Sequence, residues 1–241
     1  MKHPVVHFEI HAKDRKAATE FYRSLFGWHI QPMEEMDYGM VDTHAGSGFN
    51  GGITTAEGDQ AFATVYIETP DIEATLKKAE SLGAKVLVPI TEIPDVVTIA
   101  FLQDPAGNPF GIVKGDGGPQ VSPGDGVPVN WFEIMGDDAQ ALQDFYTELF
   151  EWKISQQPMP GYGIVEWPDH KTGGAIGAID NAPSYVAIYA MVPDPAATSA
   201  KAKELGARIM MEPSYMEGGD VTVGMMIDPQ GAMFGFYKSG K

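Results

Sequence analysis

Hydrophobic and polar positions at the start of the chain predict a strand followed by an amphipathic helix. Residues 5–11 alternate between apolar and polar side chains, which is the period of a half-buried strand. Asp14 can cap the helix that follows, because its carboxylate can accept the free N–H groups of a first turn. The side chains that recur at helical spacing and predict its buried face are Ala17, Ala18, Phe21, Tyr22 and Leu25. Gly27 marks the end of this helix.

The same order of elements follows a second time before residue 115. Strand-like runs complete the first unit, and a new strand then leads into a helix that Asp71 caps and that ends near Leu82, before Gly83. The strands expected after the two helices and between them are residues 38–43, 51–55, 62–69, 85–88, 96–102 and 110–114. Each unit is therefore predicted to consist of a strand, a helix and further strands.

The chain matches itself when it is shifted by 124 positions. The matched segments include Phe8-Glu9-Ile10 with Phe132-Glu133-Ile134, Phe21-Tyr22 with Phe145-Tyr146, Trp28 with Trp152, Asp104-Pro105 with Asp228-Pro229 and, with one residue of slippage, Leu82-Gly83-Ala84 with Leu205-Gly206-Ala207. These matches predict two homologous domains, residues 1–115 and 127–241. Residues 116–126 are rich in Gly and Pro and are predicted to form an exposed linker.

Composition and charge narrow the partners that we expect. A length of 241 residues suits two domains, and 44% hydrophobic with 20% charged residues is typical of globular proteins. The net charge of -17 disfavours nucleic acid and anionic membrane surfaces, and the absence of cysteine excludes thiolate chemistry. Neither a signal-peptide pattern nor an apolar run long enough for a membrane span occurs, so we expect a cytoplasmic protein without nucleic-acid or membrane partners.

Two motifs that occur in both halves carry a resemblance to a known family. They are Asp14…Phe21-Tyr22…Leu25-Phe26-Gly27-Trp28 with its repeat from Asp138, and Asp104-Pro105-Ala106-Gly107-Asn108-Pro109-Phe110 with its repeat Asp228-Pro229-Gln230-Gly231. In these motifs the chain resembles the vicinal oxygen chelate superfamily, which includes glyoxalases, bleomycin-resistance proteins and extradiol dioxygenases. The resemblance implies an α+β fold of tandem glyoxalase-like domains. In each, two βαβββ units form a curved mixed sheet with a cup that contains the site.

The resemblance also implies where a divalent metal would bind. Relatives hold one metal with His and Glu side chains on the cup side of different strands. His7 occupies the first of these positions, but the other positions carry residues that are poor donors: Trp131, Thr64, Ala187, Gly111 and Gly235. A lone imidazole cannot replace the hydration shell of a divalent ion. We therefore expect no metal and no other cofactor.

Strand alternation assigns side chains to the cup. Because Phe8 and Ile10 are apolar, His7, Glu9 and His11 are expected on the opposite face, as are Trp131, Glu133 and Met135 in the second half. Glu9 and Glu133 are the candidate catalytic residues, since a carboxylate between apolar walls can act as a general base. The candidate ligand-binding residues are His7, Tyr38, Thr64, Tyr66, Trp131, Tyr162 and Tyr189. Alternatively, the carboxylates form internal pairs and the aromatic rings only fill the sheet interface.

Three functions fit these features. The first is a metal-free protein that binds a small molecule at a degenerate metal site. The second is a glyoxalase-type lyase or isomerase that acts on a small carbonyl compound, without metal and with Glu9 or Glu133 as the base. The third is a structural or interaction scaffold without chemistry. A monomer provides all four βαβββ units, and a homodimer is also compatible with the sequence.

Overall fold

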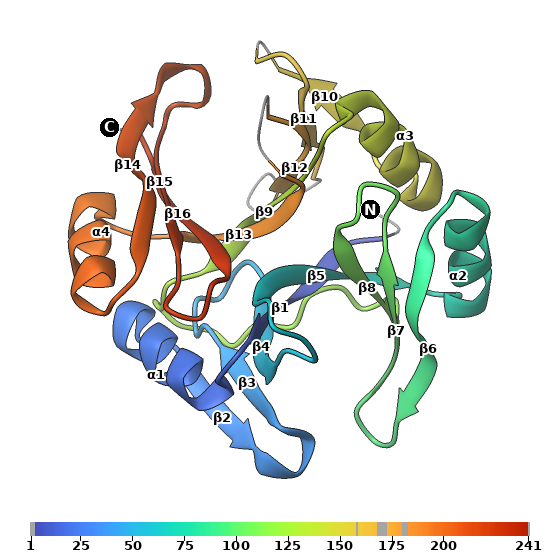
Figure 1. Ribbon diagram of the computed structural model, residues 1–241, viewed down its shortest axis with the longest axis horizontal. Helices are drawn as coiled ribbons and strands as arrows, with labels where there is room; N and C mark the ends of the chain where they lie inside the picture. Colours follow the sequence, from blue (N-terminus) through green and yellow to red (C-terminus); the bar gives the residue numbers. More distant parts are fainter. Residues whose placement is uncertain (1–2, 158, 168–172, 180–182, 241) are drawn as a thin grey trace. The chain divides into compact units, whose positions relative to one another are not determined.

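A computed structural model describes residues 3–157, 159–167, 173–179 and 183–240 of the chain (Figure 1). The elements of the first half are β1 (Val5–Ala12), α1 (Arg15–Phe26), β2 (His29–Met33), the 3₁₀ helix η1 (Glu34–Met36), β3 (Tyr38–Asp42), β4 (Asn50–Thr55), β5 (Phe62–Thr69), α2 (Ile72–Ser81), β6 (Lys85–Ile93), β7 (Val97–Gln103) and β8 (Pro109–Lys114).

The second half repeats this order element by element. Its elements are β9 (Val129–Gly136), α3 (Ala139–Phe150), β10 (Ile154–Gln156), β11 (Tyr162–Val165), β12 (Gly173–Ala178), β13 (Tyr185–Met191), α4 (Pro195–Glu204), β14 (Arg208–Met216), the 3₁₀ helix η2 (Glu217–Gly219), β15 (Val221–Ile227) and β16 (Met233–Ser239).

The strands form two eight-stranded mixed sheets of the same topology. Their orders are β2-β3-β4-β1-β5-β8-β7-β6 and β10-β11-β12-β9-β13-β16-β15-β14. Within each sheet, β5 with β8 and β13 with β16 run parallel, whereas the outer pairs run antiparallel. The predicted α+β class and the duplicated βαβββ order are confirmed.

The predicted helix starts after Asp14 and Asp71 are confirmed as well. Both aspartates accept a backbone N–H from the residue three positions later, and Asp138 and Asp194 cap the helices of the second half in the same way. The αL conformation of Gly27, with φ 74°, ends α1 as expected.

Two outer strands differ from the prediction. Strand β2 was not singled out, because Ile30 is its only buried residue and Pro32 interrupts its pattern. Strand β6 was expected to end at residue 88 but continues through Pro89 to Ile93. Both lie at the edges of their sheet, where a proline does not remove a ladder hydrogen bond that the sheet needs.

The chain divides into two compact units, and each combines parts of both sequence halves. The α2–α3 unit comprises Met1–His7, Thr64–Gln120 and Phe132–Val186, and the α1–α4 unit comprises Phe8–Ala63, Val121–Trp131 and Ala187–Lys241. The first βαβββ module of one half is thus packed with the second module of the other half. The boundaries 1–115 and 127–241 stay a prediction about where the duplicated segments begin and end.

A tyrosine–aspartate hydrogen bond joins the two halves inside each unit. In the α1–α4 unit the hydroxyl of Tyr22 donates to Asp228 Oδ2 at 2.8 Å, and in the α2–α3 unit Tyr146 donates to Asp104 Oδ2 at 3.1 Å. The other carboxylate oxygen of each aspartate accepts backbone N–H groups of its own turn, from Gln230, Gly231 and Ala232 and from Ala106 and Asn108 respectively. All four side chains are buried. The Asp-Pro motif therefore fixes a turn and binds the helix of the opposite half.

Other contacts between the halves occur at equivalent positions in the two units. Phe234 of β16 packs against Tyr22, Phe26 and Trp28, as Phe110 of β8 packs against Phe145, Tyr146 and Phe150. Indole N–H groups donate across the halves, from Trp28 to the carbonyl of Val127 and from Trp152 to the carbonyl of His3, both at 2.8 Å.

Two lysines also donate hydrogen bonds from one half to the C-terminal end of a helix in the other half. Lys201 donates to the carbonyl of Leu25 at 3.3 Å and Lys78 to that of Leu149 at 3.5 Å. A cation at a helix C-terminus interacts favourably with the helix dipole. Figure 1 shows the resulting pairs of neighbouring helices, α1 with α4 and α2 with α3.

The C-terminal end of the segment 116–126 is bound to the α1–α4 unit by hydrogen bonds. Ser122 donates to the carboxylate of Asp42 and its carbonyl accepts the N–H of Gly46, while Gly126 donates to the carbonyl of His44 at 2.8 Å. The side chains of this segment are exposed or half-buried, so it covers its unit rather than spacing two domains apart.

No helix among the described residues is long and apolar enough to cross a membrane.

We expect Tyr22→Phe to lower the free energy of unfolding by about 1–3 kcal/mol, because it removes the hydroxyl donor of the buried Asp228 Oδ2. Tyr146→Phe should lower it by less, because Asp104 Oδ2 still accepts the side-chain N–H of Asn108 at 3.1 Å. Burial raises the pKa of Asp228, and the hydrogen bond from Tyr22 opposes this rise. Without Tyr22 the pKa rises further. The loss of stability should therefore be full at neutral pH and shrink as the pH falls through the pKa of Asp228. Denaturant unfolding at several pH values measures both effects.

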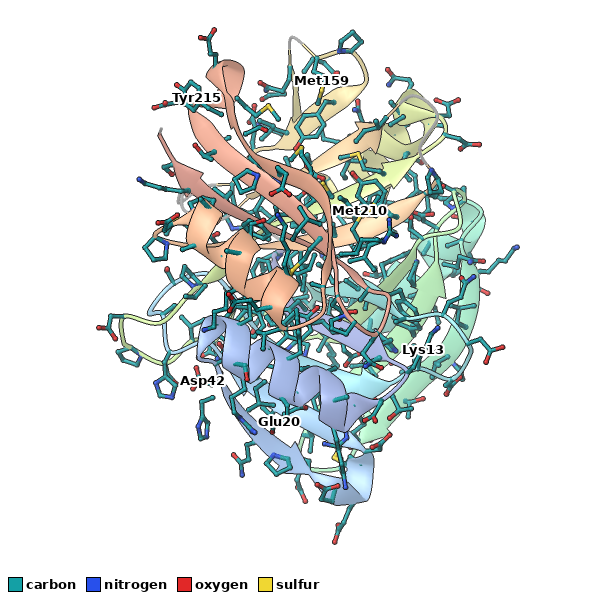
Figure 2. The ribbon with its side chains drawn as sticks, turned by 60° about the vertical axis from the view of Figure 1, so that its left-hand side comes forward. Lys13, Glu20, Asp42, Met159, Met210 and Tyr215 are labelled. Carbon is teal, nitrogen blue, oxygen red and sulfur yellow. The ribbon has the colours of Figure 1, made fainter. Side chains whose placement is uncertain are left out.

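Tyr215→Phe is the matched control. Tyr215 also donates to a carboxylate, that of Asp220 at 2.7 Å, but this pair lies on the surface at the end of the β14–β15 hairpin (Figure 2). Water replaces the lost bond there, so the unfolding midpoint should not change. An equal effect of all three substitutions would contradict a special role for the buried pairs.

Candidate functional site

Strands β1 and β9 hold a glutamate at the same position of each half. Glu9 and Glu133 are both 8% exposed, and they lie between apolar residues that point into the core, Phe8 and Ile10 in one strand and Phe132 and Ile134 in the other. A carboxylate at this degree of burial must be hydrogen-bonded or paired. The partners of the two glutamates differ, and the difference defines two clusters.

The Glu133 cluster lies in the α2–α3 unit and consists of Glu133, Tyr162 and Tyr185. The hydroxyl of Tyr162, from β11, donates to Glu133 Oε1 at 2.6 Å, and that of Tyr185, from the start of β13, donates to Oε2 at 3.3 Å. Burial raises the pKa of Tyr185, and the negative charge and hydrogen bond of Glu133 raise it further. Tyr185 therefore stays a neutral phenol, and the cluster presents one carboxylate between two aromatic rings.

The Glu9 cluster lies in the α1–α4 unit and consists of Glu9, His11 and Phe62. The Nε2 atom of His11 lies 2.8 Å from Glu9 Oε2, since residues two apart on a strand share a face. The imidazole stacks on the ring of Phe62, with centroids 4.2 Å apart and planes at 14°. In the same unit the hydroxyl of Tyr38 lies against Gly52, where a Cβ atom would come within 1.8 Å of it. This cluster pairs a carboxylate with an imidazole.

In the α2–α3 unit, aromatic side chains lie at the positions where the sequence resemblance predicts metal ligands. The ring of His7 contacts the edge of Tyr66, with centroids 5.9 Å apart, and Tyr66 stacks on Phe101. The ring of Tyr66 covers Gly111, its partner in the parallel register, so closely that a Cβ there would come within 2.1 Å of it. The hydroxyl of Thr64 donates to the carbonyl of Pro109 at 2.8 Å.

The α1–α4 unit repeats this arrangement with still fewer donors. Tyr189 covers Gly235, where a Cβ would come within 2.0 Å of the ring, and Ala187 and Trp131 occupy the remaining positions. Within the described ranges no three His, Asp or Glu side chains are grouped so that they could hold a metal ion. The residues present do not fit the metal of the superfamily, because rings and glycines replace carboxylates and imidazoles.

The structure brings together some of the predicted residues and gives others separate roles. Glu133 and Tyr162 form one cluster, and His7 contacts Tyr66. Glu68, which shares their predicted face, is held by the backbone: its Oε2 accepts the N–H of Gly118 at 2.8 Å. Whether any of these side chains touches a ligand stays a prediction.

Sequence reasoning missed the residues that distinguish the two clusters. Tyr185 and Phe62 begin their strands two positions before Ala187 and Thr64, so strand alternation could have placed both on the same face as those residues. His11 was expected on the same face as Glu9, but it was not predicted to lie beside that carboxylate.

Comparison with known proteins finds similar sequences and similar folds. Residues 5–44 match the family model of the bleomycin resistance protein-like N-terminal domain. CFP32 of Mycobacterium tuberculosis, which is named as a glyoxylase, is 27% identical over 246 residues, covering 95% of this chain and 92% of that protein. The anthracycline biosynthesis protein DnrV of Streptomyces peucetius is 26% identical over 253 residues, covering 94% and 90%.

Solved structures show the same fold at lower identity. The Mn(II)-bound glyoxalase from Novosphingobium aromaticivorans has a TM-score of 0.75 and 14% identity, covering 99% of this chain and 82% of that one. The 2,3-dioxygenase LapB from Pseudomonas sp. KL28 has a TM-score of 0.70 and 11% identity, covering 99% and 92%. Together with the fold, these similarities support membership of the vicinal oxygen chelate superfamily.

We expect Gly111→Ala and Gly235→Ala each to destabilise the fold by about 1–3 kcal/mol, because the new Cβ would overlap the ring of Tyr66 or Tyr189. Gly58→Ala is the control, since nothing lies within 4 Å of a Cβ at that position. Chemical denaturation compares the three variants. If Gly111→Ala costs no more than Gly58→Ala, the ring of Tyr66 does not fill the space beside Gly111.

Proposed function

We propose that the chain binds a small, neutral or cationic, partly aromatic molecule without the help of a metal. The observation that carries this proposal is the Glu133 cluster, in which a nearly buried carboxylate is flanked by two tyrosine hydroxyls at 2.6 and 3.3 Å. A few polar groups among aromatic walls are typical of sites for small organic ligands. The relatives named for anthracycline biosynthesis agree with a ligand that has an aromatic part.

The charge of the chain supports a ligand that is not an anion. The net charge is -17, and the sequence has three arginines. Arg15 is buried and pairs with Glu34 and Asp37, and Arg23 bonds to Glu20 and to the carbonyl of Ile30. These two guanidinium groups are engaged within the α1–α4 unit, so they do not form the forked clamp that a ligand carboxylate or phosphate prefers.

A glyoxalase-type lyase or isomerase is the second candidate, and the Glu9–His11 pair favours it. A carboxylate 2.8 Å from an imidazole places two groups that can carry a proton side by side. Such an enzyme would move a proton next to the carbonyl of its substrate through this pair and not through a metal. The relative CFP32 is named for the related chemistry.

A thermal-shift screen of metabolites and antibiotics, with and without EDTA, tests the proposal. A ligand at about one hundred times its dissociation constant should add about 2.7 kcal/mol of stability, which is a measurable shift in Tm. We expect hits that persist in EDTA and that weaken in Glu133→Gln or Glu9→Gln. Glu57→Gln, which removes an exposed carboxylate, should leave them unchanged.

The other outcomes separate the alternatives. Hits that neither cluster variant weakens would move the site elsewhere in the chain. A complete absence of hits would favour a structural scaffold. Turnover of a small carbonyl compound that His11→Met abolishes would establish the second candidate, and turnover that requires added metal would contradict both.

A further inference from the structure

The chain contains three places where an asparagine or an aspartate precedes a glycine: Asn50-Gly51, Asp116-Gly117 and Asp125-Gly126. Such pairs are chemically labile, because glycine has no side chain that hinders attack of its backbone nitrogen on the side-chain carbonyl carbon of the preceding residue. The attack requires a glycine N–H that is free and a backbone that can rearrange. Asn50-Gly51 lacks this freedom, since it lies in strand β4 and Asn50 Oδ1 accepts the N–H of Thr43 at 2.9 Å.

The Asp116-Gly117 pair meets the requirements for attack. Both residues are exposed. Within the part of the chain that the structure describes, the N–H of Gly117 donates to no acceptor. The flanking glycines are held instead: Gly115 donates to a carbonyl at the end of β5 at 2.9 Å, and Gly118 donates to Glu68 Oε2 at 2.8 Å. The labile bond therefore lies in a short exposed bridge between two anchored glycines.

The Asp125-Gly126 pair has the same local sequence in a different environment. The tripeptides Gly115-Asp116-Gly117 and Gly124-Asp125-Gly126 are identical. In the second, however, the N–H of Gly126 donates to the carbonyl of His44 at 2.8 Å, and a Cβ at Gly124 would come within 2.3 Å of the same carbonyl oxygen. This pair reaches the reactive geometry only after local unfolding.

We propose that Asp116 is a site of spontaneous conversion to isoaspartate and that folding protects Asp125 from the same reaction. The backbone nitrogen of Gly117 bonds to the side-chain carboxyl carbon of Asp116, and the carboxyl hydroxyl leaves as water with the amide proton. Water then opens the resulting succinimide ring at the former main-chain carbonyl. The chain now continues through the side-chain carbon, and the former main-chain carboxyl is free. The reaction consumes no oxidant and no cofactor.

The product changes the bridge between the anchored glycines in a defined way. It inserts one additional methylene group into the main chain between Gly115 and Gly118. A Cβ at Gly115 would come within 2.4 Å of Glu68 Oε1, so the bridge already packs tightly on this buried carboxylate. We therefore expect the hydrogen bond from Gly118 to Glu68 to loosen first. This inference goes beyond the proposed function and does not depend on a ligand.

Ageing of the full folded chain in water labelled with heavy oxygen measures the reaction at each pair, because ring opening incorporates the label and peptide mass spectrometry locates it. We expect Asp116 to convert at least about tenfold faster than Asp125 in the folded protein, since only Asp125 requires local unfolding. In denaturant the two rates should agree within about twofold, because the tripeptides are identical and unprotected. Equal rates in the folded protein, or no conversion of Asp116, would overturn the proposal.

Gly117→Val is the matched control variant. A Cβ at Gly117 would meet only Gln120, at 3.8 Å, so the fold accommodates the side chain, which hinders the attack on Asp116. Hydrogen exchange at the Gly118 amide then measures the consequence. It should quicken in the aged protein and stay slow in the equally aged variant. Conversion in Gly117→Val as fast as in the unmodified chain would contradict the attack by this nitrogen, and unchanged exchange in converted protein would contradict the loosening at Glu68.

Discussion

The structure depends on a hydrogen bond that occurs twice, from a tyrosine of one sequence half to an aspartate of the other. Tyr22 with Asp228 and Tyr146 with Asp104 are buried pairs, and each aspartate also fixes the turn that precedes the last strand of its module. Burial raises the pKa of both aspartates, so an unpartnered carboxylate would be unfavourable here. Because these hydrogen bonds join one sequence half to the other, each compact unit requires both halves.

This exchange determines where the candidate chemistry lies. The Glu9 cluster belongs wholly to the α1–α4 unit and the Glu133 cluster wholly to the α2–α3 unit. Each is a local arrangement on strands whose opposite face packs into the aromatic core. The two halves carry the same carboxylate, but Glu133 accepts hydrogen bonds from two phenols whereas Glu9 lies beside an imidazole.

Much of the fold could be predicted from the sequence, because its signals are local or repeated. The four helix-capping aspartates and the glycine after α1 set the helix ends, and the self-match of the chain gave the duplicated module order. The edge strand β2 was not predicted, because a single buried residue does not form an alternating pattern. The hydrogen bond from Tyr22 to Asp228 could not be inferred from spacing, since its partners are 206 residues apart. Strand alternation could have placed Tyr185 and His11 on the faces of Glu133 and Glu9, but their contacts with the carboxylates come from the structure.

The most direct test of this account is to cut the chain between its halves and ask whether they stay together. A protease site inserted between Asp116 and Gly117, both of which are exposed, allows cleavage of the folded protein. Size-exclusion chromatography and denaturant unfolding then examine the product. The account predicts that the two fragments elute as one complex and unfold in one transition, because each compact unit contains parts of both. Fragments that separate and remain folded on their own would contradict it.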